Sequence, residues 1–223
     1  LVDPAFRDRK GMNSVIEAVE RHKGKLLAVF YTHDHPDHLA DDVLLKEAFN
    51  VPVWSASESS DRVLRDGEVL QLGNQEWTVL HTPGHHPDHL CLASNCGLVA
   101  GDMVAGIGTI LIRPGEGEMS TYINQLQRLL DLDPHLIFPA HGPVIPLPEK
   151  TLERYIRHRS IRHEKVLAAV DAGNSDLETI AKIAYEDTPG ANPRLAANQT
   201  LSHLQSHEKD GNVMRVDDGW VRA

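Results

Sequence analysis

The sequence has only two cysteines, Cys91 and Cys96, among its 223 residues. The segment between them is Leu92-Ala93-Ser94-Asn95, a spacing that fits neither a zinc knuckle nor the disulfide framework of a secreted protein. We expect both to be buried thiols of a hairpin, in the reducing environment of a cytoplasmic protein.

Long apolar runs and excess positive charge are also lacking. No segment approaches the roughly 18 consecutive apolar residues of a membrane-spanning helix, and we expect no leader and no membrane association. Lysine and arginine number 22 against 32 aspartates and glutamates, giving a formal net charge of −10. Because phosphate contacts need a basic surface, this balance disfavours general nucleic-acid binding.

The most informative motif is a histidine-rich segment that follows the apolar run at residues 26–31: Thr32-His33-Asp34-His35-Pro36-Asp37-His38. In extended backbone, side chains two residues apart point the same way, so His33 and His35 can bind one cation. If the chain then turns into a helix, Asp37 and His38 can face a second cation. Imidazole and carboxylate together suit a borderline divalent ion, zinc first among the candidates.

The periodicity of apolar residues predicts an α/β protein with mixed sheets. Helices are expected at residues 12–19, 39–49, 120–132 and 152–170, from a capping box at 175–178 to about 186, and after residue 193. Strands are expected at residues 26–31, 51–54, 68–72, 76–81, 89–93, 97–100 and 135–138, with a terminal hairpin at 212–216 and 220–222.

A change in composition marks a domain boundary. Three prolines cluster at positions 143, 146 and 148, and prolines so close together are typical of a linker. We therefore expect one domain over residues 1–150 and a small helical domain over residues 151–223. Helices followed by a short hairpin are typical of a winged-helix module.

Three further motifs place metal-binding side chains directly after apolar strands: His81-Thr82-Pro83-Gly84-His85, Val99-Ala100-Gly101-Asp102 and Pro139-Ala140-His141-Gly142. Glycine and proline shape tight loops there, and loops at one edge of a sheet can converge on one point. The four motifs, in this order, resemble those of the metallo-beta-lactamase superfamily over roughly residues 1–150.

The resemblance implies an αββα sandwich that holds two divalent ions, zinc first, with manganese or iron as alternatives. Seven side chains would bind them: His33, His35 and His85 one ion, Asp37, His38 and His141 the other, and Asp102 both. Asp37 and Asp102 would also be catalytic, since they orient the attacking hydroxide between the ions. Three further histidines are expected to orient ligands or to contact substrate: His81, His86 and His89.

Finer features resemble the beta-lactamase-like-protein-2 subgroup of this family: His89, the run Arg157-His158-Arg159 with Arg162, and the terminal hairpin. That subgroup joins the hydrolase domain to a winged-helix-like tail, and its members include a single-strand endoribonuclease and carrier-protein thioesterases. The family fold normally begins with hairpin strands before the segment that matches Leu1-Val2-Asp3-Pro4. We expect those N-terminal strands to be missing from the sheet here.

The resemblance implies a zinc-dependent hydrolase whose bridging hydroxide attacks an ester or thioester bond of a small-molecule or acyl-carrier substrate. The alternative is a metal-dependent endoribonuclease or phosphodiesterase on single-stranded RNA, which the basic residues of the helix at 152–170 favour and the overall acidity opposes. A DNA-binding metal sensor is disfavoured, because the expected recognition helix offers only Arg194 and Lys209 as fixed cations. Assembly into oligomers stays open.

Overall fold

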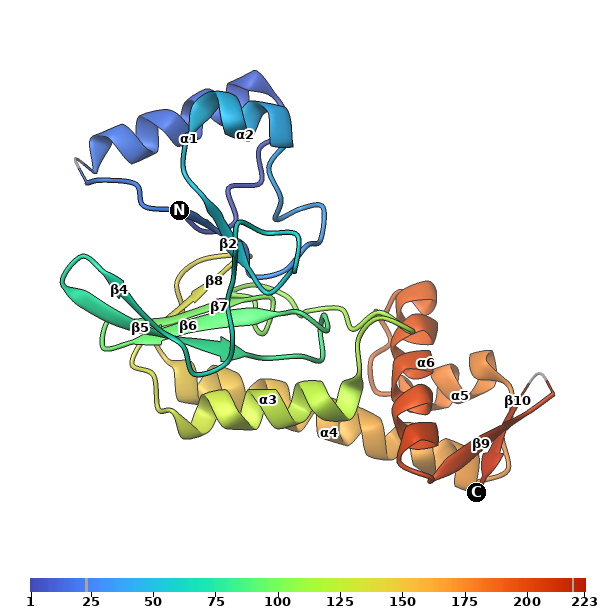
Figure 1. Cartoon of the computed structure of the whole chain (residues 1–223). Coiled ribbons are helices and arrows are strands. Elements are labelled where there is room, and N and C mark those ends of the chain that lie inside the picture. The colour runs from blue at the N-terminus through green and yellow to red at the C-terminus, as the bar shows by residue number, and fades with distance from the viewer. Residues whose placement is uncertain (23, 218) are drawn as a thin grey trace. The chain divides into compact units, whose positions relative to one another are not determined.

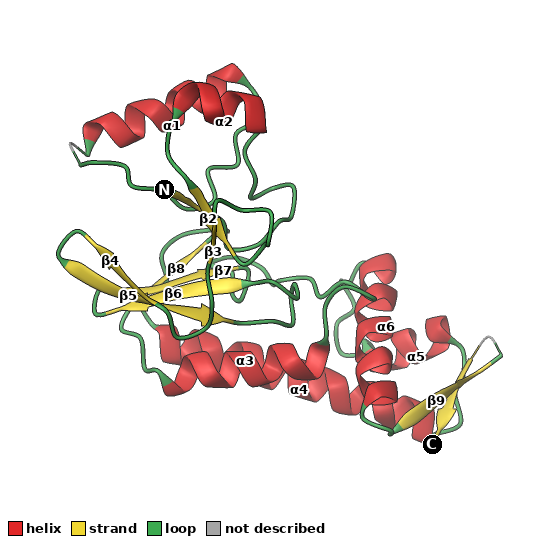
Figure 2. Ribbon diagram, in the orientation of Figure 1, coloured by secondary structure: helices red, strands yellow, loops and turns green. Residues whose placement is uncertain are grey.

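The structure is a computed structural model that describes residues 1–22, 24–217 and 219–223 (Figure 1 and Figure 2). Contacts divide the chain into two compact units that interleave in the sequence. The first unit comprises Leu1–Thr82, Asp88–Ile107 and Leu136–Val144, and the second comprises Pro83–Pro87, Gly108–His135 and Ile145–Ala223. A division by contacts is not a division into domains, so the expected domains at residues 1–150 and 151–223 stay a prediction.

A small parallel sheet in the first unit leads the chain into the histidine-rich segment. Its strands, in spatial order, are β1 (Val29–Phe30), β2 (Val53–Ser55) and β3 (Arg62–Val63). Val2 adds an isolated parallel bridge to Phe30. Both residues of β1 are buried, so the residues that follow this strand begin at the edge of an apolar core.

Two helices pack against this sheet (Figure 1). They are α1 (Arg9–Arg21) and α2 (Asp42–Ala48), and Met12 and Leu45 share a buried cluster with Val29 of β1. Each helix starts at an aspartate whose side chain accepts hydrogen bonds from backbone N–H groups of the first turn, Asp8 for α1 and Asp41 for α2. The helices thus fix the chain on both sides of the histidine-rich segment.

A five-stranded sheet completes the first unit. Its strands, in spatial order, are β4 (Val69–Leu72), β5 (Gln75–His81), β6 (Leu90–Ser94), β7 (Gly97–Gly101) and β8 (Ile137–Pro139). Neighbouring strands are antiparallel except for the parallel pair β7 and β8. Because parallel strands end at the same edge of a sheet, Asp102 after β7 and His141 two residues after β8 emerge side by side.

The second unit consists of helices and a terminal hairpin. Its elements are α3 (Met119–Asp131), α4 (Pro148–Asp171), α5 (Leu177–Ala184), α6 (Pro193–Lys209), β9 (Val213–Val216) and β10 (Gly219–Arg222). Val166, Ile180, Leu204 and Trp220 share its buried core. The sequence predicts helices followed by a hairpin, and the elements occur in this order. The winged-helix character of this part stays a prediction. The expected turn residue Asp218 lies outside the described residues.

Two arginines of α4 are buried instead of forming part of a basic surface. Arg159, 2% exposed, donates hydrogen bonds to Gln199 Oε1 of α6 (3.1 Å) and to Thr109 Oγ1 (2.8 Å). Arg162, 4% exposed, donates to Asp187 Oδ1 (3.0 Å). Two of the arginines expected on the basic surface of α4 are therefore not available there to bind phosphate groups.

Several local expectations from the sequence are wrong. The helix expected at 39–49 begins only at Asp42, because Asp41 caps it in extended conformation, and Asp176 rather than Ser175 caps α5. Cys91 is buried as expected, but Cys96 is exposed, because it lies in the turn between β6 and β7. Among the described residues, no helix combines the length and apolarity needed to cross a bilayer.

Candidate metal centre

The histidine-rich segment is anchored by Thr32, the first residue after the buried end of β1. Thr32 is fully buried, and its backbone N and its Oγ1 both donate to the carboxylate of Asp3, at 2.9 and 2.7 Å. Its carbonyl accepts from Leu90 N of β6 at 2.8 Å. The segment is therefore tied both to the chain's first residues and to the five-stranded sheet.

His33 and His35 point toward each other from this anchored backbone. They are 3% and 5% exposed, and His33 Nε2 lies 2.8 Å from His35 Nδ1. Because the hydroxyl of Thr32 donates to Asp3, it accepts from His33 Nδ1 at 3.0 Å, and this tautomer leaves the Nε2 lone pair facing His35. Two imidazole nitrogens at this separation can bind one cation.

His38 lies beside this pair and faces two carboxylates. Its ring centroid is 4.1 Å from that of His33. Its Nδ1 lies 2.9 Å from Asp3 Oδ2, and its Nε2 lies 3.4 Å from Asp102 Oδ1. A carboxylate that holds the Nδ1 proton leaves Nε2 with a lone pair for a metal ion.

Asp102 lies between His38 and a second, more exposed pair of side chains, His141 and Asp37. Its Oδ1 lies 3.3 Å from His141 Nε2, and His141 Nε2 lies 3.5 Å from Asp37 Oδ2. Potential ligand atoms therefore converge twice within the first unit, once at His33, His38 and Asp102 and once at Asp37, His38 and His141. The side chains of Asp37 and His141 are 60% and 45% exposed, so the second cluster is open to solvent.

The electrostatics of this cluster suit a cation. Burial lowers the pKa of His38, but its hydrogen bonds to Asp102 and Asp3 and their charges outweigh this and raise the pKa to about 10. His38 is buried and its Nε2 faces Asp102 Oδ1 at 3.4 Å, so a cation bound to Nε2 would take the place of the proton that the two carboxylates favour there. Imidazoles and carboxylates are also ligands that zinc, iron and manganese accept. On these grounds the residues present fit a divalent metal ion.

His89 supports the cluster from the residue just before β6. It is fully buried, its Nε2 accepts from the backbone N of Asp102 at 3.0 Å, and its Nδ1 lies 2.8 Å from Thr82 Oγ1. Gly101, with a φ of +47°, allows this approach, since a Cβ there would lie 2.5 Å from His89 Nε2. His89 therefore fixes the backbone that presents Asp102.

Three further histidines expected at the site, His81, His85 and His86, have local contacts of their own. His81 ends β5, and its backbone N donates to Asp66 Oδ1 at 2.7 Å. His85 and His86 belong to the second compact unit. There, His85 Nδ1 lies 2.9 Å from the carbonyl of Leu111, and His86 Nε2 lies 4.0 Å from Glu116 Oε1. Their roles as ligand or supporting residues stay predictions.

Asp3 is the residue of this site that sequence reasoning missed. It ends the chain's first extended segment, and its carboxylate contacts both Thr32 and His38. Asp3 entered the sequence-based predictions only as part of the segment Leu1-Val2-Asp3-Pro4, with no role at the site. The available signal was an aspartate at the end of an apolar strand, the same pattern that identified Asp102.

The chain is similar in sequence to several known proteins. The family model of the metallo-beta-lactamase superfamily matches residues 1–62 and 55–141. A beta-lactamase-like protein 2 homolog of Drosophila melanogaster is 31% identical over 218 residues, which is 88% of this chain and 73% of that protein. The homolog in Caenorhabditis elegans is 26% identical over 214 residues, 91% of this chain and 70% of the relative.

Fungal relatives and solved structures extend the comparison. An atrochrysone carboxyl ACP thioesterase of Paecilomyces divaricatus is 26% identical over 194 residues, 84% of this chain but only 60% of that protein. A metallo-beta-lactamase family protein from Thermus thermophilus has a TM-score of 0.78 at 19% identity, covering 100% of this chain and 89% of that one. A beta-lactamase domain protein from Burkholderia ambifaria reaches 0.79 at 22% identity, covering 97% and 80%.

The two solved structures show the same α/β fold. The family model and the Drosophila relative establish the family, since they span most of the described first unit and most of both chains, respectively. The chain belongs to the metallo-beta-lactamase superfamily, whose members are generally hydrolases.

Proposed function

We propose that this protein uses two divalent cations to hydrolyse an ester or thioester bond. The observation that carries the proposal is the position of Asp102, whose Oδ1 lies 3.4 Å from His38 Nε2 and 3.3 Å from His141 Nε2. A carboxylate between two groups of imidazoles can bind two cations at once, as two-metal hydrolases require.

The proposed ligands follow the seven motif positions. They are His33, His35 and His85 for one cation, Asp37, His38 and His141 for the other, and Asp102 for both. His85 is included on the strength of its motif alone. Zinc is the first choice, with manganese or iron as alternatives, and one structural neighbour is known in a di-iron-bound form (TM-score 0.51, 24% identity). When bound, such a pair of cations supplies a hydroxide nucleophile near neutral pH.

The side chains of this protein would orient the nucleophile and hold the ligand residues in place. Asp37 and Asp102 would accept a hydrogen bond from the nucleophile and so fix its orientation. Asp3 would hold His38, and His89 would hold the backbone of Asp102. The candidate site has the histidine and carboxylate groups that this reaction needs, so we assign no serine or cysteine as nucleophile.

An acyl substrate is favoured over a nucleic acid for two reasons. The relative from Paecilomyces divaricatus is named as a thioesterase that acts on an acyl carrier protein. In addition, Arg159 and Arg162 are buried in internal contacts and the chain carries a formal charge of −10, which opposes binding of polyphosphates. We therefore propose a small-molecule or carrier-bound acyl group as substrate.

Cleavage of single-stranded RNA is the second candidate. The observation that favours it is the exposure of Arg154 and Arg157 on α4, which could contact phosphates. A DNA-binding metal sensor has weaker support, because Ser202, His203 and Ser206 of α6 are buried and so cannot read a groove.

Metal analysis tests the site directly. The purified chain, loaded with zinc, is expected to hold two equivalents. Asp102→Asn should lose most of the second ion, and Asp131→Asn, a matched change on the exposed end of α3, should lose none. Equal stoichiometry in the Asp102 variant and the parent would contradict the ligand assignment.

A substrate panel tests the reaction. Metal-loaded protein would be offered an acyl thioester, a lactone, a simple phosphodiester and single-stranded RNA. We expect turnover of the thioester, with at least a roughly hundredfold loss in the Asp102 variant. Turnover of RNA alone would replace this proposal by the second candidate.

A further inference from the structure

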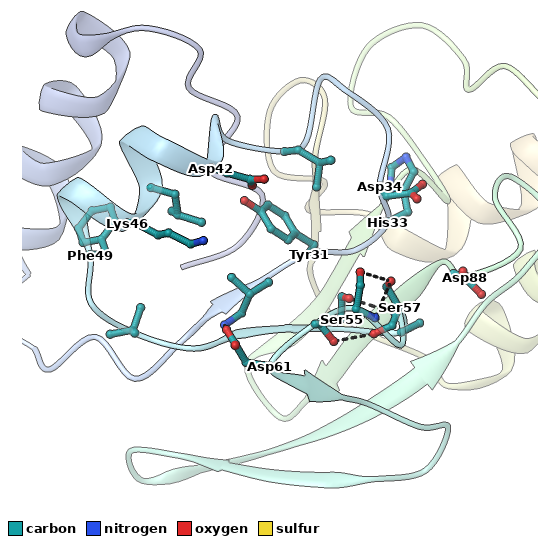
Figure 3. A pocket seen from close by; sticks show the side chains of 17 residues that line it. Tyr31, His33, Asp34, Asp42, Lys46, Phe49, Ser55, Ser57, Asp61 and Asp88 are labelled. Carbon is teal, nitrogen blue, oxygen red and sulfur yellow. Dashed lines mark hydrogen bonds between the residues drawn. The ribbon is translucent and has the colours of Figure 1, made fainter.

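A cavity of about 460 Å³ lies wholly within the first unit and ends at His33 (Figure 3). One wall comes from α2 and the residues beside it, and the other from β2 and the serine-rich turn that follows it. Figure 3 shows Lys46 and Phe49 at one end, and His33, Asp34 and Asp88 at the other. Because His33 also belongs to the candidate metal cluster, the cavity adjoins the proposed site of bond cleavage.

The lining of the cavity is partly apolar, and Phe49 lies beside Lys46 at the end away from His33. The apolar lining residues include Leu45, Phe49, Val51 and Val53, which belong to the apolar cluster that also contains Met12 of α1 and Val29 of β1. Phe49, Val51 and Val53 are only half-buried, so a ligand that covers them would remove apolar surface from water. That gain favours a hydrocarbon group against these side chains.

The serine side chains of the wall at residues 55–60 form hydrogen bonds mainly with one another and with the backbone of the same turn. Ser57 N donates to Ser55 Oγ at 3.0 Å, the hydroxyls of Ser57 and Ser59 lie 2.9 Å apart, and Ser60 Oγ donates to the carbonyl of Ser57 at 2.7 Å. These hydroxyls already bond within the turn. The wall therefore contacts a ligand mainly through its shape, because its serine hydroxyls are already used in hydrogen bonds within the turn.

The charge of the cavity excludes one class of ligand. Its lining carries four carboxylates, Asp34, Asp42, Asp61 and Asp88, against the single ammonium of Lys46. Like charges this close repel an anion, since they lie within about one Debye length of it. A phosphate or carboxylate group inside the cavity would be disfavoured, and an uncharged group would not.

We propose that this cavity binds the acyl chain of the substrate, and that it selects an uncharged, apolar acyl group of medium length. The carbonyl carbon would lie at the His33 end and the hydrocarbon chain would extend toward Phe49. This inference rests on the proposed ester or thioester hydrolysis, and it names the substrate class that the site would accept.

Direct binding tests the cavity without turnover. The ketone 2-octanone has the carbonyl and the chain but no leaving group, so its binding to the metal-loaded chain can be followed by calorimetry. Saturable binding is expected, weakened at least tenfold in Val51→Trp, which fills the cavity. Val43→Ala, an exposed change on α2 outside the lining, is the matched control and should bind as the parent does. No binding, or equal binding to the Trp variant, would overturn the proposal.

A chain-length series tests selectivity. For acetyl, butyryl, hexanoyl and octanoyl thioesters, kcat/KM should rise about fourfold for each methylene that the cavity buries. Val51→Trp should abolish this rise, and Phe49→Ala should shift the best substrate to a longer chain. Val51→Trp makes the cavity smaller and Phe49→Ala makes it larger, so either variant alone can test the proposal if the other fails to fold. A flat series in the parent would overturn the proposal.

Charge selectivity needs a separate comparison. The adipoyl thioester, which ends in a carboxylate, should react at least tenfold more slowly than the hexanoyl thioester. Asp42→Asn should narrow this ratio, whereas Glu17→Gln, on the exposed face of α1 and outside the lining, should not. A ratio near one in the parent would contradict the charge argument.

These experiments separate the two proposals. If 2-octanone binds as expected but no ester or thioester is cleaved, the cavity stands and the proposed hydrolysis fails. If thioesters are cleaved at rates that ignore chain length and the cavity variants, the hydrolase stands and the acyl cavity is wrong.

Discussion

Asp3 holds two parts of the candidate site at the scale of single residues. Its carboxylate accepts hydrogen bonds from the backbone and side chain of Thr32, and it binds His38 Nδ1. The first contact fixes the start of the histidine-rich segment, and the second orients the imidazole that faces Asp102. One side chain therefore determines how the segment presents its nitrogens.

Replacing Asp3 with Asn should weaken binding of the second cation. The amide keeps the shape of the side chain but holds the Nδ1 proton of His38 less strongly, and loss of such a partner typically costs about 10–100-fold in metal affinity. Zinc titration of the metal-free chain would measure this, with Asp8→Asn as the control on the same segment. Unchanged affinity for both ions would contradict the role of Asp3.

Gly84 is a second residue with a sharp expectation. Its φ is +127°, and a Cβ there would lie 2.4 Å from the backbone N and Cα of Tyr122 in α3. Gly84→Ala should therefore displace α3 from the Pro83–Pro87 segment, and a thermal-unfolding midpoint lower by several degrees is expected.

Gly115→Ala separates steric overlap from backbone strain. Gly115 also has a positive φ, +81°, but no atom lies within 4 Å of its would-be Cβ. Its alanine variant should show only the small cost of the backbone conformation. Equal destabilisation by the two changes would mean that contact with Tyr122 is unimportant.

The sequence indicated the clustered histidines but not the carboxylate that contacts one of them. His33, His35 and His38 lie within one short segment, so local spacing was enough to bring them together. Asp3 acts on partners that are 29 and 35 residues away, and nothing local indicates that the chain's first segment returns to this strand end. A contact of that range depends on tertiary packing, which periodicity does not encode.

A histidine cluster joins two helices at the scale of elements. His163 of α4 stacks on His207 of α6, with ring centroids 3.6 Å apart, and His163 Nδ1 lies 3.0 Å from His203 Nδ1. Burial and the nearby His207 lower the pKa of His163 to about 4, and burial likewise lowers the pKa of His203 and His207. The positive charges of Arg159 and Arg162 lower the pKa of His203 further. The negative charges of Asp210 and Glu118 act in the opposite direction on His163 and raise its pKa.

This cluster should make the second unit sensitive to acid. Because the folded pKa values lie below the ordinary 6.5, the unfolded chain binds more protons as the pH falls below that value. The stability that the neutral imidazoles contribute is therefore present above about pH 6.5 and lost as the pH falls toward about 4. Circular dichroism of the unfolding midpoint across this range would show the loss.

His203→Leu isolates the contribution of the cluster from that of other groups. His203 is fully buried, and its Nε2 has no hydrogen-bond partner among the described residues. Leucine fills the space without a group to protonate, so the difference in midpoint between about pH 7.5 and about pH 5 should shrink. His22→Gln, on the exposed end of α1, should leave the difference unchanged. An unaltered pH dependence in His203→Leu would exclude the cluster as its cause.

Elements were predictable where their pattern was long and failed where it was short. Helix α3 has repeated apolar positions and was expected within one residue of its observed bounds, and the end of α4 was expected equally closely, although α4 begins four residues before the expected start at residue 152. The strands β1 and β3 have two residues each. β1 was therefore expected too long, and β3 was missed, since two residues cannot show an alternation. The start of α2 was wrong by several residues because a single cap, Asp41, decides it.

Charge links the site to the whole molecule. The chain has a formal net charge of −10, and two divalent cations would change this to −6. Asp3, Asp37 and Asp102 all lie within hydrogen-bond or ion-pair distance of His38 or His141. The fold therefore gathers negative charge where the proposed cations would offset it, and sequence spacing alone could not show that the three carboxylates meet.

Removal of metal should lower the stability of the chain. A ligand that binds only the folded state stabilises it by about 2.7 kcal/mol when its free concentration is 100 times its dissociation constant. Chelation should therefore lower the thermal-unfolding midpoint by roughly 5–10 °C for a chain of this length, and added zinc should restore it. Asp102→Asn should have a lower midpoint before chelation and lose less on chelation, because it already lacks most of the second ion. Asp131→Asn should respond as the parent does, whereas a parent midpoint that ignores both chelator and zinc would contradict coupling between metal binding and folding.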